Sequence, residues 1–317
     1  MSENPEIVMQ AKHIVKQFPA SHGRTLTACN DINLTMYKGR TLGIVGESGC
    51  GKSTFVRMVI SLDQPTSGEI LYHGKNITGL SKKETWENRQ NLQMVFQDPL
   101  ASFNPKMKIG DILTEPLMNY KKIKRSERNA KARELLRMVE LPEDFVDRYP
   151  HNMSGGQRQR ISIARALSVQ PEFVVCDEPI SALDVSIRAQ VLNLLSELQK
   201  EHGLTYLFIA HDLSVMRFIC DRIAVIHKGV IVELADTEKL FEHPLHLYTR
   251  SLLSAIPMPD PDAEKNKILE IYDPSIHNYA VDKPCWMEIE DGHYIMANGE
   301  ELQEYREMLE ERPFGKK

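Results

Sequence analysis

The chain has 317 residues, of which 42% are hydrophobic and 26% charged, the balance of a globular protein with a large core. A net charge of −5 without a basic stripe argues against nucleic-acid binding. No apolar run approaches the ~20 residues of a membrane-spanning helix, and residues 1–6 lack the features of a secretory signal. The five cysteines are scattered without a C-x-x-C pair, so we expect free thiols and a cytoplasmic location.

The first predicted elements are strands. Residues 7–18 and 26–36 alternate loosely between apolar and polar side chains, which predicts half-buried antiparallel strands. Residues 41–45 form a continuous apolar run, the pattern of a strand that is buried on both faces. Residues 52–61 then have helical spacing. The segment between this strand and this helix is therefore a loop that leads into a helix N-terminus.

This loop, residues 46–53, fits the P-loop pattern G-x-x-x-x-G-K-[ST]. Its glycines let the backbone approach phosphates, and the helix presents its positive N-terminus to them. We expect Lys52 to reach the β- and γ-phosphates and the Ser53 hydroxyl to bind Mg²⁺. The position of Cys50 beside Lys52 predicts a lowered thiol pKa. The expected nucleotide-binding residues here are Gly46, Glu47, Ser48, Gly49, Cys50, Gly51, Lys52, Ser53 and Thr54.

A second phosphate-binding element follows a charge-rich, helical segment. Residues 98–153 have helical patterns, which predicts an inserted helical subdomain at about residues 98–159. Ser154 and Gln157 then have the spacing of a capping box at the start of another helix. Gly155 and Gly156 leave the first N–H groups of that helix free to face an anion. We call residues 154–157 the signature loop.

Two adjacent carboxylates lie in the second half of the chain. Asp177 and Glu178 follow the apolar strand 173–176, and another buried strand spans 205–210. We expect Asp177 to hold Mg²⁺ and Glu178 to polarise the water that attacks the γ-phosphate. Residues 221–233 read as a hairpin.

The C-terminal part is predicted in less detail. Residues 240–253 have the spacing of one amphipathic helix, and prolines at 257, 259 and 261 end it. Beyond these prolines we expect a short acidic tail.

The motifs together resemble those of the ATP-binding subunits of ABC transporters, whose signature is LSGGQ, with Met153 here replacing the leucine. The resemblance implies an α/β P-loop NTPase with a RecA-like core, an antiparallel β subdomain and the helical subdomain. It implies that Gln97 contacts Mg²⁺ and the membrane partner, and that His211 contacts the γ-phosphate. It assigns Asp184 to the D-loop and Phe18 to stacking on adenine. Two such chains would dock head to tail, each closing the ATP site of the other with its signature loop.

A finer resemblance is carried by residues 97–105, 149–151 and 248–257. These segments are similar to oligopeptide and dipeptide importers, most of all to the F-type subunit of oligopeptide permeases. The resemblance implies a D-type ATPase partner, two transmembrane permease subunits, an extracytoplasmic peptide-binding protein and a peripheral position on the cytoplasmic face of the membrane. Residues 1–257 would be the ATPase domain and 258–317 a C-terminal extension. Relatives often bind an iron-sulfur cluster there, but Cys285 alone cannot supply such a site, so we expect ATP and Mg²⁺ only.

Other readings of the same motifs stay open. A soluble ABC ATPase that acts on ribosomes or DNA usually carries two cassettes or a nucleic-acid-binding insertion, and this sequence has one cassette and no basic stripe. An assembly factor, such as a carbon-phosphorus lyase accessory subunit, retains all the motifs. An importer of another solute, such as nickel or glutathione, would also retain them, because binding protein and channel select the solute.

Overall fold

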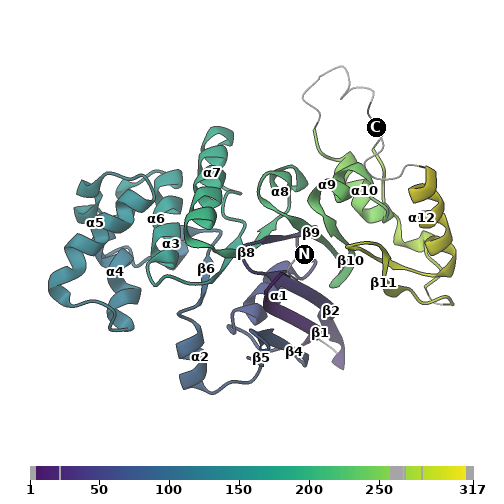
Figure 1. Cartoon of the computed structure of the whole chain (residues 1–317), viewed down its shortest axis with the longest axis horizontal. Helices are drawn as coiled ribbons and strands as arrows, with labels where there is room; N and C mark the ends of the chain where they lie inside the picture. The colour runs from purple at the N-terminus through teal and green to yellow at the C-terminus, as the bar shows by residue number, and fades with distance from the viewer. Residues whose placement is uncertain (1–4, 21–22, 258–266, 268, 280, 312–317) are drawn as a thin grey trace.

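The computed structural model describes residues 5–20, 23–257, 267, 269–279 and 281–311. The molecule is elongated, and its elements form three groups along the longest axis (Figure 1). A group of helices from the middle of the sequence lies at one end, the sheets and the helices packed on them lie in the centre, and the C-terminal elements lie at the other end.

The smaller sheet has four antiparallel strands in the order β2-β1-β4-β5. Its strands are β1 (Ile7–Pro19), β2 (Thr25–Tyr37), β4 (Ser67–Tyr72) and β5 (Lys75–Asn76). The two predicted N-terminal strands are therefore confirmed as an antiparallel pair. Their alternating side chains bury one face of this sheet against helix α1 (Lys52–Val59), which also contacts the larger sheet.

The larger sheet has eight strands in the order β11-β12-β10-β9-β3-β8-β7-β6. Its bounds are β3 (Thr41–Val45), β6 (Leu92–Val95), β7 (Phe173–Asp177), β8 (Thr205–Ala210), β9 (Arg222–His227), β10 (Val230–Asp236), β11 (Cys285–Glu290) and β12 (His293–Ala297). Neighbours from β9 to β6 are parallel, whereas β9/β10, β10/β12 and β12/β11 pair antiparallel. The predicted hairpin is thus β9 and β10.

The central strands are apolar on both sides because both faces of the sheet are covered. Ile44 and Val175 face α1 and the small sheet, whereas Val45 and Cys176 face the core shared with the helical subdomain. Helices α7 (Val185–His202) and α8 (Leu213–Ile219) cover this second face. Since β3, β7 and β8 are parallel, the loops that follow them emerge at the same edge of the sheet.

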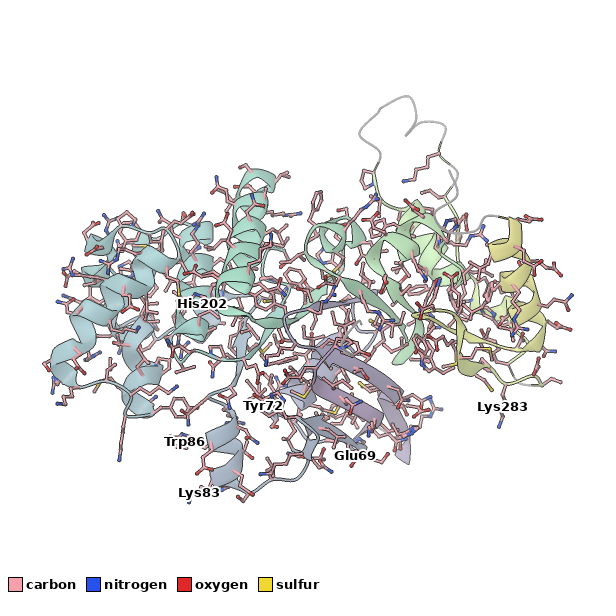
Figure 2. All side chains as sticks on the ribbon, in the orientation of Figure 1. Glu69, Tyr72, Lys83, Trp86, His202 and Lys283 are labelled. Atoms are coloured by element: carbon pink, nitrogen blue, oxygen red, sulfur yellow. The ribbon has the colours of Figure 1, made fainter. Side chains whose placement is uncertain are left out.

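The predicted helical subdomain is confirmed as a compact group at one end of the molecule (Figure 1). Its α-helices are α3 (Pro99–Ser102), α4 (Ile109–Asn119), α5 (Arg128–Met138) and α6 (Gly155–Leu167), and its 3-10 turns are η2 (Arg125–Glu127), η3 (Glu143–Asp147) and η4 (Pro150–Asn152). The apolar faces of α4, α5 and α6 form a shared core. Helix α2 (Lys82–Asn88) projects separately and has no buried residue, and its Lys83 and Trp86 are labelled in Figure 2.

The single helix predicted for residues 240–253 is wrong, because the structure has two. Helix α9 (Thr237–Glu242) ends before Pro244, and α10 (Leu247–Ser254) begins after His246. Proline lacks the N–H that would continue the first helix. The N–H groups of Leu245 and His246 donate instead to the buried carboxylate of Glu233, at 2.9 and 3.1 Å.

The C-terminal extension is also more ordered than a tail. After the 3-10 turn η5 (Pro274–Ile276) it forms β11, β12 and α12 (Gly299–Glu311). Strand β12 pairs with β10 and so extends the main sheet. His293 of β12 and Glu233 of β10 are both wholly buried, and their side chains lie 2.8 Å apart. This buried pair joins the C-terminal extension to the main sheet.

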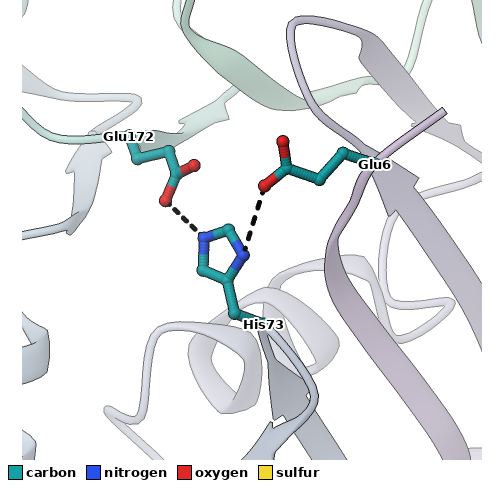
Figure 3. A group of neighbouring side chains, drawn as sticks. All are labelled: Glu6, His73 and Glu172. Carbon is teal, nitrogen blue, oxygen red and sulfur yellow. Dashed lines mark hydrogen bonds and ion pairs between the residues drawn. The ribbon is translucent and has the colours of Figure 1, made fainter.

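A second polar link joins the small sheet to the large one (Figure 3). The imidazole of His73, in the turn after β4, has Nε2 2.7 Å from the carboxylate of Glu172 and Nδ1 3.7 Å from that of Glu6. The Tyr72 hydroxyl donates to the same Glu172 oxygen at 2.6 Å. Each ring nitrogen faces a different carboxylate, so the imidazole bridges two acids. The three side chains do not converge on one point as the ligands of a metal ion would.

Candidate nucleotide-binding site

The P-loop, residues 46–53, packs so closely on its surroundings that glycine is required at two positions. A Cβ atom on Gly46 would lie 2.2 Å from the carbonyl oxygen of Ile226. A Cβ atom on Gly51 would lie 2.2 Å from the carbonyl oxygen of Ala28, and Gly51 also has φ +110. The glycine pattern in the sequence therefore reflects contacts with β9 and β2 as well as room for a phosphate.

Lys52 closes this loop on itself. Its side chain is buried, and its ammonium donates to the carbonyl oxygens of Gly46 at 2.6 Å and Glu47 at 2.8 Å. Ser53 follows as an exposed residue of the first turn of α1, where the helix has free N–H groups. Charge and donors thus converge at one concave loop, as a bound phosphate requires.

The expectation of a lowered thiol pKa at Cys50 is wrong. Its side chain is 7% exposed and packs beneath the loop, where a Cβ on Gly46 would lie 2.9 Å from its sulfur. Burial raises the pKa of the Cys50 thiol above its ordinary value, although Lys52, 3.8 Å away, acts in the opposite direction. Burial likewise raises the pKa of Cys29 to about 12. Cys50 is a packed thiol, and its desolvation therefore affects the pKa more than the nearby positive charge does.

Asp177 ends β7 and Glu178 follows it with a left-handed backbone, φ +45, held by a bond from its N–H to the carbonyl oxygen of Ile209 at 3.0 Å. Burial and the adjacent charge of Glu178 raise the pKa of Asp177, and Lys52 partly offsets them. Two adjacent carboxylates in a partly buried site fit a hard divalent cation, which prefers oxygen ligands of this kind. Asp177, Ser53 and Gln97 supply suitable oxygens.

The structure brings three predicted catalytic residues together. Gln97 follows β6, Glu178 follows β7 and His211 follows β8. Nε2 of Gln97 lies 3.1 Å from Oε2 of Glu178, and Nδ1 of His211 lies 3.4 Å from the same oxygen. Ser181 begins the D-loop that ends at Asp184 but is not among the predicted site residues. Its hydroxyl lies 3.5 Å from Gln97 Nε2 and donates to the Glu178 carbonyl oxygen at 3.1 Å.

The signature loop has the predicted capping box. Ser154 Oγ accepts from the N–H of Gln157 at 3.3 Å, and Gln157 Oε1 accepts from the N–H of Ser154 at 3.0 Å. Gly156 lies against α7, since a Cβ there would be 2.5 Å from Cγ2 of Ile187. The loop starts α6 in the helical subdomain, and Figure 1 shows α6 apart from α1. One chain therefore does not bring its signature loop to its own P-loop.

Two other predicted residues lie at exposed positions. Asp184 is the exposed N-cap residue of α7 and makes no capping bond with its side chain. Phe18 lies near the end of β1, is 37% exposed, and has the Lys16 ammonium 5.0 Å from its ring centroid. Both side chains are open to a ligand or a partner. A further residue that the sequence analysis did not single out for this site is Tyr248, whose hydroxyl accepts from the N–H of Glu47 at 3.1 Å.

The doubly covered parallel sheet, the P-loop and the acidic pair after β7 define a P-loop ATPase with an inserted helical subdomain. Comparison with known proteins agrees. Residues 29–181 match the family model for ABC transporters, and residues 232–284 match that for the oligopeptide/dipeptide transporter C-terminal region. Among the described residues, no helix is long and apolar enough to span a membrane.

Curated relatives match over most of their length. The oligopeptide transport ATP-binding protein OppF of Bacillus subtilis is 51% identical over 95% of this chain and 99% of its own. The oligopeptide transport ATP-binding protein AmiF of Streptococcus pneumoniae is 52% identical over 93% of this chain and 97% of its own. The dipeptide transport ATP-binding protein DppF of Lactococcus lactis is 46% identical over 95% of this chain and 97% of its own.

Solved structures agree with the fold. The ATP-binding cassette MJ0796, as a dimer in a post-hydrolysis state with ADP and Pi, has a TM-score of 0.66 and 31% identity, covering 72% of this chain and 98% of that one. The chain therefore belongs to the ATP-binding proteins of the ABC transporter family, in the branch that carries the oligopeptide/dipeptide transporter C-terminal region, and it is an ATPase.

Proposed function

We propose that this chain hydrolyses ATP to power the import of oligopeptides or dipeptides across a membrane. The observation that supports this most is the match of residues 232–284 to the oligopeptide/dipeptide transporter C-terminal region, with relatives of about half-identical sequence named for peptide transport. The P-loop and the Gln97–Glu178–His211 group supply the machinery for hydrolysis.

The proposed mechanism assigns one task to each residue. Lys52 and the first N–H groups of α1 bind the β- and γ-phosphates, and Phe18 stacks on adenine. Glu178 orients the water that attacks the γ-phosphate in line, while Gln97 and His211 fix the position of its carboxylate. Ser53, Asp177 and Gln97 would hold Mg²⁺. When bound, Mg²⁺ neutralises charge on the phosphates.

The separation of the signature loop from the P-loop supports a head-to-tail dimer. The free N–H groups at the start of α6 are suited to an anion, and they lie apart from the chain's own P-loop. We propose that Ser154, Gly155, Gly156 and Gln157 close the ATP site of a second ATPase subunit, with Asp184 at the contact. The MJ0796 cassette, a structural neighbour, is itself described as dimeric.

A cleft of about 210 Å³ between the helical subdomain and the core supports docking of a permease subunit. It is lined by apolar and cationic side chains, including Leu62, Phe96, Tyr120 and Arg165. Leu62 is 42% exposed and Phe96 38%, and Phe96 directly precedes Gln97. An apolar element of the membrane partner seated here would contact the segment that positions Glu178. We therefore propose a peripheral position for the chain on the cytoplasmic face of the membrane.

The test is reconstitution of the full chain with candidate membrane subunits and a candidate peptide-binding protein. We expect co-purification of two permease subunits and a second ATPase, and Mg²⁺-dependent ATP hydrolysis that a peptide-loaded binding protein stimulates. Stimulation by nickel or glutathione but not by peptides would overturn the substrate class. A chain that never co-purifies with membrane subunits would instead favour the soluble assembly-factor role. Stoichiometric iron with acid-labile sulfide in anaerobically purified protein would contradict Mg²⁺ as the only metal.

A further inference from the structure

Tyr248 of α10 contacts the P-loop from a region outside the nucleotide-binding motifs. Its side chain is 1% exposed, and its hydroxyl oxygen accepts the N–H of Glu47 at 3.1 Å. The carbonyl oxygen of the same Glu47 accepts from the Lys52 ammonium at 2.8 Å. Glu47 is therefore held on one side by the lysine that we assign to the phosphates and on the other by Tyr248.

Tyr248 is itself fixed by a cluster of rings. Its N–H donates to Nδ1 of His246 at 3.0 Å, and its ring lies 4.3 Å from the ring of His227, measured between centroids. The ring of Tyr272, from the C-terminal extension, packs edge-on at 5.4 Å and also lies 5.2 Å from His227. Burial raises the pKa of Tyr248 to about 12, so its hydroxyl stays neutral at physiological pH.

A series of direct contacts connects the C-terminal extension to the P-loop. Tyr272 packs on Tyr248, the Tyr248 hydroxyl holds Glu47, and Glu47 holds Lys52. A loop that binds an anion through many N–H groups gains affinity when its conformation is fixed before the ligand arrives. A cleft lined by Glu47 and Tyr272 opens beside this cluster, whereas Tyr248 itself is buried.

We propose that Tyr248 is a positioning residue of the P-loop, and that Tyr272 makes the C-terminal extension part of the nucleotide site. The inference rests on the proposed role of the P-loop in ATP binding. It adds that nucleotide affinity depends on Tyr248 and Tyr272, two residues that lie outside the nucleotide-binding motifs.

The first test compares two substitutions that each remove one buried hydroxyl. Tyr248→Phe removes the acceptor of Glu47 N–H and keeps the ring. Tyr206→Phe removes an equally buried hydroxyl that donates to the Leu195 carbonyl oxygen at 3.1 Å, away from the P-loop. For a fluorescent ATP analogue bound to the full chain, we expect Kd to rise about tenfold for Tyr248→Phe, the effect of losing one hydrogen bond, and less than twofold for Tyr206→Phe. In the reconstituted transporter, KM for ATP should rise while kcat at saturating ATP stays within twofold.

The second test examines the extension. Tyr272→Ala should weaken binding about threefold, whereas Ile271→Ala, at a neighbouring side chain that is 91% exposed, should not change it. Wild-type affinity in both Tyr248→Phe and Tyr272→Ala would overturn the inference, as would equal weakening by Tyr206→Phe at a similar loss of Tm. A wild-type chain that binds no ATP would overturn the proposed nucleotide site itself.

Discussion

Nε2 of Gln97 lies 3.1 Å from Oε2 of Glu178, although the two residues follow different strands and are 81 positions apart in the sequence. His211 approaches the same oxygen at 3.4 Å from a third strand. The Glu178 carboxylate is therefore held by two side chains. Gln97 directly follows Phe96, which lines the proposed permease cleft. A shift of that segment would move the group that we assign to the attacking water.

Glu178→Gln removes the charge of this carboxylate and keeps its size. Turnover should fall by roughly 10²- to 10⁴-fold, the contribution of a general base, while ATP affinity stays near the wild-type value. Single-turnover hydrolysis and nucleotide binding measure the two effects. Glu172→Gln, at the residue just before the start of β7, is the matched control and should keep full turnover. Wild-type turnover in the Glu178 variant would contradict the assignment.

Gly156→Ala tests the signature loop. The new Cβ would lie 2.5 Å from Cγ2 of Ile187, so the start of α6 must move away from α7. We expect the assembled transporter to lose most of its ATPase activity and the isolated chain to keep its ATP affinity, because this loop serves the opposite subunit. Adding Ile187→Ala should restore part of the activity by removing the clash. Loss of ATP affinity in the isolated single variant would argue that the loop serves its own chain.

Thiol labelling tests the buried position of Cys50. Four cysteines are buried, and Cys285 on β11 is exposed. A maleimide at neutral pH should therefore modify Cys285 and leave Cys50 unlabelled, with no loss of ATP binding and no protection by ATP. Peptide mapping identifies the labelled cysteines. As a control, Cys285→Ser should abolish labelling of the folded chain. Rapid labelling of Cys50 would show that the loop opens readily.

The acid stability of the fold should depend on Glu172. Burial alone would raise its pKa, but the bonds with His73 and Tyr72 outweigh burial, so the pKa lies below its ordinary value. A carboxyl whose pKa is lower in the folded chain stabilises the fold fully above its unfolded pKa of about 4.3, and loses this effect as the pH falls through the folded value. The drop in Tm from pH 7 to pH 3.5 should thus be smaller for Glu172→Gln than for the wild type. An exposed glutamate of α7, changed as Glu201→Gln, should behave like the wild type, and equal drops in all three chains would contradict the role of Glu172.

The sequence predicts the parts of this protein that depend on local pattern. Apolar runs identify β3, β7 and β8, and the loops that follow them carry the P-loop, the acidic pair and His211. Contacts between distant segments are not visible in such patterns. The burial of Cys50 depends on how closely the loop packs on β9, and the contact of Tyr248 joins residues 201 positions apart. Pro244 is a local signal for the break between α9 and α10, but the apolar periodicity of residues 240–253 masks it.

The pairing of β12 with β10 also has a consequence during synthesis. His293 and Glu233 are 60 positions apart, so the ribosome releases β10 well before the strand that covers its edge. Until β12 arrives, the nascent chain exposes unpaired N–H and C=O groups along β10 and a glutamate that lacks its buried partner, and such an edge invites pairing with other chains. The edge of β10 is therefore covered only by the far end of the sequence, and we expect a chain that stops before β12 to aggregate more readily than the full chain.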